Sequence, residues 1–179
     1  MSKTNNTLRI TLILLLIILL VVLASVILLS TYTRFFTDDF CEASAASKTS
    51  FFEYMKLRYT GWTWRFSFTF LSGLISLLGW RAPSVFSAVL ILLWFVSLMF
   101  AMYQVLTIIE HPFTMLSAAM YASLILVFLF SSLPALYESV FWLIGSINYS
   151  LPLIIFSLLA GFYLLIGRNK SKRIYSFLL

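Results

Sequence analysis

The sequence predicts an all-α protein: a polytopic membrane helix bundle of about five to six transmembrane helices, with a short amphipathic helix in the first outer loop. Hydrophobic residues make up 62% of the 179 residues and charged residues only 10%, whereas soluble domains have roughly 45–50% and about 25%. Apolar runs long enough to approach the roughly 20 residues of a helical span recur along the chain. We therefore expect a single transmembrane domain over residues 1–179.

The first predicted span lies near residues 10–30, after a short basic leader that contains Lys3 and Arg9. Its apolar run is longer than the 7–15 residues typical of a signal-peptide core, so we interpret it as an uncleaved span. Lys and Arg favour the cytoplasmic side of a span. The leader is therefore expected inside the cell and the loop of residues 31–64 outside.

Within this loop, Ser50-Phe-Phe-Glu53 has the spacing of a capping box, in which the hydroxyl and the carboxylate each satisfy a free backbone amide. Gly61 is a suitable helix stop. Apolar side chains recur on one face of the intervening segment, at Phe51, Phe52, Met55 and Tyr59, with Glu53, Lys56 and Arg58 towards the other. We predict an amphipathic helix lying on the membrane surface; the alternative is a solvated loop.

Four further spans are predicted near residues 65–79, 84–109, 114–131 and 152–167. Residues 135–150 are a re-entrant or surface segment, or part of a crossing. The basic cluster at 167–173 is expected in the cytoplasm. Two cytoplasmic ends require an even number of crossings, yet five apolar runs are clear. Either the ambiguous segment also crosses, or one run does not cross, or the basic tail lies outside.

The strongest candidates for chemistry are Asp38 and Asp39, because three of the chain's six acidic residues fall within the short stretch 34–42. Adjacent residues do not share a helix face, so we expect one to act as a base or ligand while the other orients it. The alternative is a turn in which Asp caps the next helix.

Arg58 and Arg65 flank an aromatic patch that contains Tyr59, Trp62 and Trp64. Guanidinium groups bind phosphate bidentately, and aromatic faces cover apolar sugar or lipid surfaces. A phosphate on a membrane-borne donor would suit this patch. Taken alone, the residues favour a plain interfacial belt with snorkelling arginines.

Glu138, Trp142, Gly145 and Tyr149 recur about one helical turn apart and so are expected on one stripe. A carboxylate at membrane depth is costly and marks a functional candidate; on the membrane surface that cost disappears. His111 has no second His or Cys nearby, so no metal site is predicted. The net charge of +6 is assigned to residues flanking spans, not to nucleic-acid binding.

Together these motifs resemble an uncharacterised family of bacterial multi-pass membrane proteins related to glycosyltransferases of GT-C type, which include glucosyltransferases that decorate surface polysaccharide. The resemblance runs from about residue 8 to the C-terminus. The matching residues are Asp38 and Asp39, then Tyr59, Trp62 and Arg65, then Glu138, Trp142, Gly145 and Tyr149.

The resemblance implies transfer of a sugar from a polyprenyl-phosphate donor at the outer face of a bacterial inner membrane. Asp38 or Asp39 would be the catalytic base or a metal ligand, since some members need a divalent metal. Arg58 or Arg65 would steady the lipid phosphate, and the Glu138 motif would face the same side as Asp38. Members of the family are longer, and Ile174 to Leu179 looks like the start of another span, which favours a fragment, a truncated gene product or one half of a split enzyme.

The alternative class is non-catalytic: a membrane accessory or lipid-flipping subunit that acts with a partner membrane subunit. The small size of the chain and its few polar groups favour this class. A solute transporter is less favoured, because no span carries a charge in its middle and transport pathways generally do.

Overall fold

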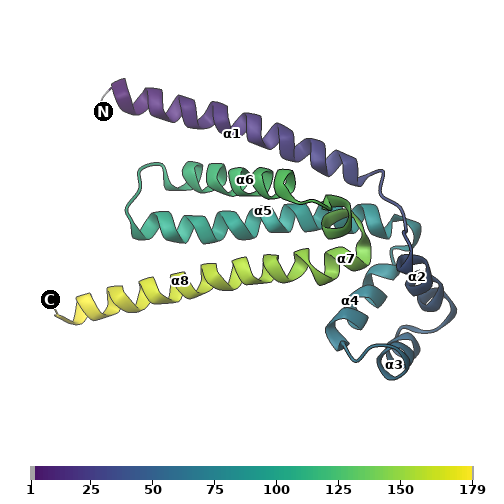
Figure 1. Ribbon diagram of the computed structural model, residues 1–179. Coiled ribbons are helices and arrows are strands. Elements are labelled where there is room, and N and C mark those ends of the chain that lie inside the picture. The colour runs from purple at the N-terminus through teal and green to yellow at the C-terminus, as the bar shows by residue number, and fades with distance from the viewer. Residues whose placement is uncertain (1–2, 179) are drawn as a thin grey trace. The chain divides into compact units, whose positions relative to one another are not determined.

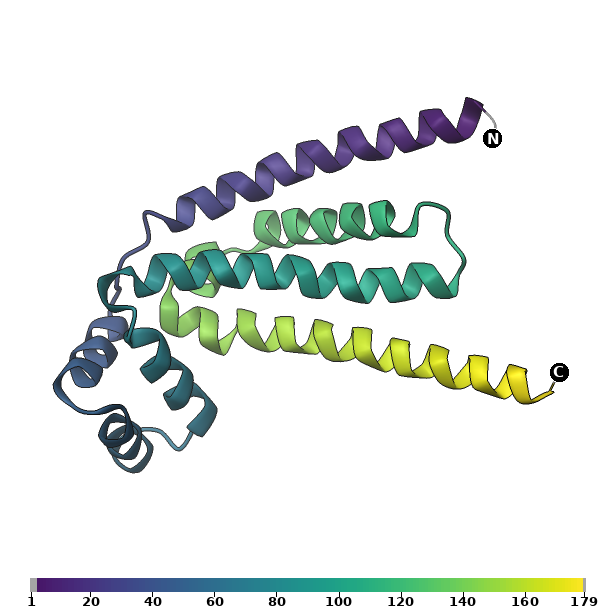
Figure 2. The same ribbon diagram turned by 180° about the vertical axis from the view of Figure 1, so that it is seen from behind.

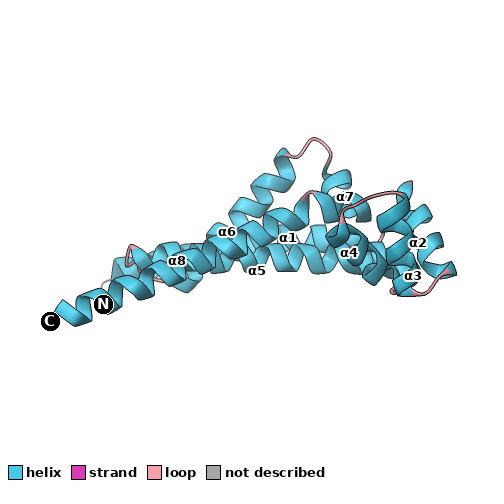
Figure 3. Cartoon of the chain, turned by 90° about the horizontal axis from the view of Figure 1, so that it is seen from below, coloured by secondary structure: helices cyan, strands magenta, loops and turns pink. Residues whose placement is uncertain are grey.

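The computed structural model describes the backbone of residues 3–178 and the side chains of residues 6–168. Figure 3 shows that helices joined by loops make up this part of the chain, so the predicted all-α fold class is confirmed. The helices belong to two compact units. Unit 1 contains the chain up to Ser25, Leu92–Leu133 and the chain from Leu153; unit 2 contains Val26–Ile91 and Pro134–Pro152.

Unit 1 is a bundle of long apolar helices. It holds most of α1 (Lys3–Ser30), α5 (Ala82–Ile108) and α8 (Ser150–Leu178) and all of α6 (Thr114–Ser132). α5 and α6 form a hairpin with α8 alongside α5 (Figure 2). Ring contacts join α5 to its neighbours, Trp94 to Phe130 at 5.8 Å and Phe100 to Phe162 at 5.1 Å.

Four helical segments of the described chain are long and apolar enough to cross a membrane: Asn6–Ser30, Gly79–Ile108, Thr114–Ser132 and Leu143–Arg168. The structure differs from the sequence expectation at residues 65–79, which form α4 (Phe66–Ser76), a helix of 11 residues. At roughly 1.5 Å per residue α4 is about 16 Å long, close to half of the ~30 Å hydrocarbon core. Four crossings, an even number, would place both ends of the chain on one side.

Unit 2 is built from short helices: α2 (Asp38–Lys48), α3 (Phe51–Gly61), α4 and α7 (Leu143–Asn148), with a 3₁₀ turn at Gly79–Arg81 and a π-helical turn at Tyr137–Phe141. Figure 1 shows α2, α3 and α4 as neighbours. Apolar side chains from α4, the start of α5 and α7 form its core: Phe68, Ile75, Ala82, Leu143, Ile144 and Ile147.

The helix predicted between Ser50 and Gly61 is confirmed as α3, with its capping box. The Ser50 hydroxyl accepts a hydrogen bond from the Glu53 amide (3.4 Å), and the Glu53 carboxylate accepts one from the Ser50 amide (3.1 Å). The inward face is centred on Tyr54, which is 2% exposed, whereas Phe52 is 82% exposed. Arg58, expected on the polar face, lies on the inward side because a buried carboxylate pairs with it there.

The segment 135–150 does not form the single helical stripe that the spacing indicates. The π-helical turn ends at Trp142, whose backbone is extended (φ −76°, ψ 119°), and α7 then begins. Gly145 packs so closely on this turn that a Cβ atom would collide with the backbone oxygen of Glu138. Gly145 is therefore required by the close packing of α7 on the turn at Glu138, and not by a shared helical stripe.

A close contact between α3 and α4 depends on Gly73. A Cβ atom at this position would lie 2.7 Å from Cε1 of the Tyr54 ring, whereas one at Gly61 would meet nothing within 4 Å. We expect Gly73→Ala to lower the free energy of unfolding by about 1–3 kcal/mol, because overpacking shifts buried groups.

Gly61→Ala is the matched control and should leave stability nearly unchanged. Thermal unfolding of the detergent-solubilised chain measures both effects. Equal unfolding temperatures for the two variants would contradict the close packing of Tyr54 on Gly73.

Candidate functional site

The two adjacent aspartates separate at the start of α2. Asp38 is exposed, whereas Asp39 is fully buried and shares the inward face of α2 with Glu42, which is 2% exposed. Residues three apart lie on the same side of a helix. The buried pair is therefore Asp39 and Glu42, and Glu42 is a site residue that the sequence analysis missed.

Both carboxylate oxygens of Asp39 accept backbone hydrogen bonds. One accepts from the Phe36 amide (3.1 Å), just before α2, and the other from the Ile144 amide (3.2 Å), in the first turn of α7. The first turn of a helix has free amides and a positive dipole end that favour a carboxylate. Asp39 thus caps α7 from another part of the chain and joins the first motif to the third.

Burial of Asp39 disfavours the ionised form of its carboxyl group. It raises the pKa of this carboxyl above its ordinary value of 3.8, although the amides of Phe36, Ile144 and Leu143 and the side chain of Trp142 each lower that pKa. Removal of the carboxyl group from water disfavours its ionised form, and this effect outweighs the hydrogen bonds.

Glu42 is the centre of a second buried polar cluster. Its Oε2 accepts a hydrogen bond from the Tyr54 hydroxyl and lies 3.2 Å from Nε of Arg58, while the Tyr54 and Ser72 hydroxyls are hydrogen-bonded at 2.9 Å. Burial, followed by the hydrogen bond to Glu42, raises the pKa of Tyr54 well above its ordinary range. The cluster joins α2, α3 and α4, and its carboxylate holds Arg58 inward.

A cavity of about 300 Å³ opens between α2 and α3. We call it the α2–α3 cavity. Lys48 and Arg58 are its cations, and Trp62 and Leu57 supply apolar surface; the rest of its lining is Ala45, Thr49, Tyr54 and Gly61. The Arg58 guanidinium lies 4.8 Å from the Trp62 ring centroid and donates to the Cys41 carbonyl (3.0 Å). No acid lines the cavity, and Arg58 is ion-paired with Glu42 outside the lining; Lys48 and the remaining donors of Arg58 suit an anionic group.

Arg65 has a different environment from Arg58. It donates to the Asn148 side chain (3.2 Å) and to the Thr63 hydroxyl (3.2 Å), and its guanidinium lies 5.3 Å from the Phe68 ring centroid. Arg65 therefore ties the second motif to α7. Tyr59, Trp64, Glu138 and Tyr149 are exposed, and Trp142 is half-buried.

The backbone is strained directly before the aspartates. Thr37 has φ 41° and ψ −109°, a conformation that is uncommon for any L-residue and particularly unfavourable for a β-branched one. Strain of this kind costs on the order of 1–3 kcal/mol and clusters at functional sites. It marks the start of α2 as a candidate site independently of the carboxylates.

The four apolar helices define a multi-pass helical membrane protein. Comparison of the chain with protein-family models, with curated proteins and with solved structures finds no match. Among the described residues, no three His, Cys, Asp or Glu side chains lie together as they would to hold a metal ion.

The raised pKa of Asp39 predicts a pH-dependent stability. Because the folded state binds the proton more tightly than the unfolded state, stability should fall as pH rises from about 4 through the folded pKa. Asp39→Asn should remove this component. Thermal unfolding temperatures measured as a function of pH provide the test, with the exposed Asp38→Asn as the control that keeps the slope. An unchanged slope in Asp39→Asn would contradict the assignment.

The Tyr54 hydroxyl should contribute measurably to stability. Tyr54→Phe leaves the buried Glu42 carboxylate with one partner fewer, and we expect a loss of about 1–3 kcal/mol. Tyr59→Phe, an exposed tyrosine on the same helix, should change the free energy of unfolding little. Chemical denaturation in mild detergent compares the two, and equal losses would argue against the buried network.

Proposed function

We propose that this chain is a membrane glycosyltransferase of GT-C type, or the N-terminal half of one, that uses a polyprenyl-phosphate sugar at the outer face of a bacterial inner membrane. One observation supports it above the others. A hydrogen bond from the Ile144 amide to the Asp39 carboxylate and one from Arg65 to the Asn148 side chain gather the three motif segments within unit 2. A shared site requires such an arrangement.

In this proposal Asp38 is the catalytic carboxylate and Asp39 positions it. Both oxygens of Asp39 are already occupied by backbone amides, whereas Asp38 is exposed. The acceptor hydroxyl oxygen attacks the anomeric carbon of the sugar, and its proton passes to Asp38 as general base. The bond from that carbon to the phosphate oxygen breaks, and the phosphate leaves with the electron pair.

The α2–α3 cavity suits the leaving phosphate. Lys48 and Arg58 can balance the charge that develops on the phosphate oxygen, and the Trp62 ring offers a surface for the sugar or the lipid chain. Glu42 fixes the direction of Arg58 through their ion pair. Arg65 is held by Asn148 and Thr63, so its role here is structural.

A divalent metal does not fit the described residues well. Asp39 is fully buried and each of its oxygens already accepts a backbone hydrogen bond, and no group of three metal-ligating side chains is present in the described part of the chain. No step of the proposed reaction is therefore routed through a metal ion.

The second candidate is the accessory or lipid-flipping subunit. The contacts of Asp39 favour this second candidate. The buried carboxylate accepts hydrogen bonds from the Phe36 and Ile144 amides and so stabilises unit 2 without a catalytic role. A partner subunit would then complete the function, and the Asp38 carboxylate would be dispensable.

Replacement of Asp38 separates these candidates. Asp38→Asn should lower transfer of labelled glucose from polyprenyl-phosphate glucose by about 10²–10⁴-fold, the usual contribution of a general base, with an unchanged unfolding temperature. The assay uses membranes that contain the full-length protein. Glu110→Gln, an exposed carboxylate in the loop between α5 and α6, is the matched control with normal activity.

Full activity in Asp38→Asn would overturn the assigned role. Full activity in both Asp38→Asn and Asp39→Asn would overturn the glycosyltransferase proposal. Recovery of a stable partner complex in mild detergent, whose function survives Asp38→Asn, would establish the accessory subunit instead.

A further inference from the structure

A second cavity in unit 2 lies where the end of α1 meets the start of α5. It has a volume of about 410 Å³, and we call it the Arg34–Arg81 cavity after its two cations. Its other lining residues are Ile27, Leu28, Ser30, Thr31, Trp80, Ser84, Val85 and Ala88. None of the lining residues is acidic, so the cavity is complementary to an anion.

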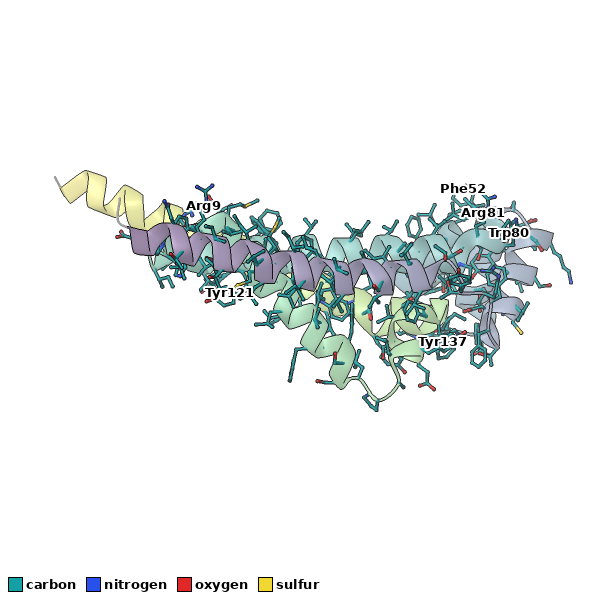
Figure 4. The ribbon with its side chains drawn as sticks, turned by 90° about the horizontal axis from the view of Figure 1, so that it is seen from above. Arg9, Phe52, Trp80, Arg81, Tyr121 and Tyr137 are labelled. Atoms are coloured by element: carbon teal, nitrogen blue, oxygen red, sulfur yellow. The ribbon has the colours of Figure 1, made fainter. Side chains whose placement is uncertain are left out.

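The two arginines are held in place but keep donors for a ligand. One terminal nitrogen of Arg34 donates to the carbonyls of Thr31 (3.0 Å) and Thr33 (2.7 Å), which leaves three of the five N–H groups of a guanidinium. Arg81 lies 4.9 Å from the centroid of the Trp80 ring, and the two are neighbours at the start of α5 in Figure 4. Planar guanidinium groups match phosphate oxygens in pairs.

The cavity also has an apolar side. Ile27 and Leu28 on α1 and Val85 and Ala88 on α5 line it, and all four belong to candidate membrane spans. Trp80 beside them is typical of the membrane–water interface. The two cations therefore flank the ends of two candidate spans, where the headgroups of a surrounding bilayer would lie.

The hydroxyl groups of the cavity are arranged as acceptors. Ser30, Thr31 and Ser84 each donate their proton to a backbone carbonyl of their own helix or turn, those of Ile27, Leu28 and Arg81. Ser30 is fully buried, whereas the oxygen lone pairs of Thr31 and Ser84 remain for a ligand that has donors of its own. The hydroxyls of a glycerol headgroup meet this requirement, whereas a choline headgroup has no hydrogen-bond donor.

We propose that the Arg34–Arg81 cavity binds an anionic phospholipid with a hydroxylated headgroup, such as phosphatidylglycerol. Arg34 and Arg81 hold the phosphodiester, the hydroxyl oxygens accept from the headgroup, and the acyl chains lie along α1 and α5. The site is separate from the α2–α3 cavity, and the proposal does not depend on glycosyl transfer.

Native mass spectrometry of the full chain in detergent tests this proposal, with dioleoylphosphatidylglycerol and dioleoylphosphatidylcholine as competing probes. The wild type should retain the anionic lipid preferentially. Arg81→Gln should weaken it about five-fold, since a basic residue at the membrane surface contributes roughly 1 kcal/mol. Lys56→Gln removes an equal charge from α3, outside the cavity, and should retain the lipid normally.

Arg34→Gln should weaken binding similarly, but Arg34 also holds the end of α1. Arg34→Lys, which keeps the charge, should recover part of the binding. Arg81 makes a ring contact with Trp80, so unfolding temperatures of Arg81→Gln with and without lipid show whether the fold is kept.

Four outcomes would overturn the proposal. Equal retention of the two phospholipids by the wild type would show that the arginines confer no selectivity. Equal affinities of Arg81→Gln and Lys56→Gln would place binding elsewhere. Displacement of the bound phospholipid by millimolar inorganic phosphate would assign the cavity to a free phosphate. Its displacement by polyprenyl phosphate, at concentrations where added phosphatidylglycerol does not compete, would assign the cavity to a lipid-linked donor.

Discussion

The buried carboxylate of Asp39 links two chain segments that the sequence keeps far apart, since its partners Phe36 and Ile144 lie 3 and 105 residues away. Hydrogen bonds to charged groups contribute about 1.5–3 kcal/mol, and an unpaired carboxylate at this position would cost more than that. Asp39 therefore holds the start of α2 against the start of α7, in addition to the apolar core contacts of α7. Whatever chemistry occurs at Asp38 uses a helix start that Asp39 holds in place.

Glu42 fulfils a comparable role on the other side of α2. Its contacts with Tyr54 and Arg58 bring α3 against α2, and the Tyr54–Ser72 hydrogen bond adds α4. Because the same carboxylate directs Arg58, the network that stabilises unit 2 also shapes the wall of the α2–α3 cavity. Stability and any anion-binding capacity of this region are therefore coupled.

The two cavities of unit 2 differ in ways that suggest different occupants. The α2–α3 cavity is lined by residues of two short helices and a neighbouring Trp. The Arg34–Arg81 cavity borders the ends of two candidate spans and has an apolar side that continues along them. The first suits a reacting ligand, and the second suits a lipid that anchors unit 2 at the interface.

Local features were predictable from the sequence because their causes are local. The apolar composition and the length of each run predict the membrane helices, and the Ser50–Glu53 spacing predicts the start of α3. Residues 65–79 show the limit of run length, because their apolar run contains a helix of only 11 residues that contributes Phe68 and Ile75 to the core of unit 2. Periodicity also fails around Trp142, where a π-helical turn resets the phase.

The sequence by itself determined an all-α membrane protein and a cluster of acids after the first span. Only the tertiary structure decided which carboxylates are buried, because burial depends on the amides and hydroxyls that distant segments supply. Asp38 and Asp39 look alike in the sequence, yet α7 reaches only one of them. Glu42 gains its role from Tyr54 and Arg58 on another helix, and no spacing rule along the chain contains that information.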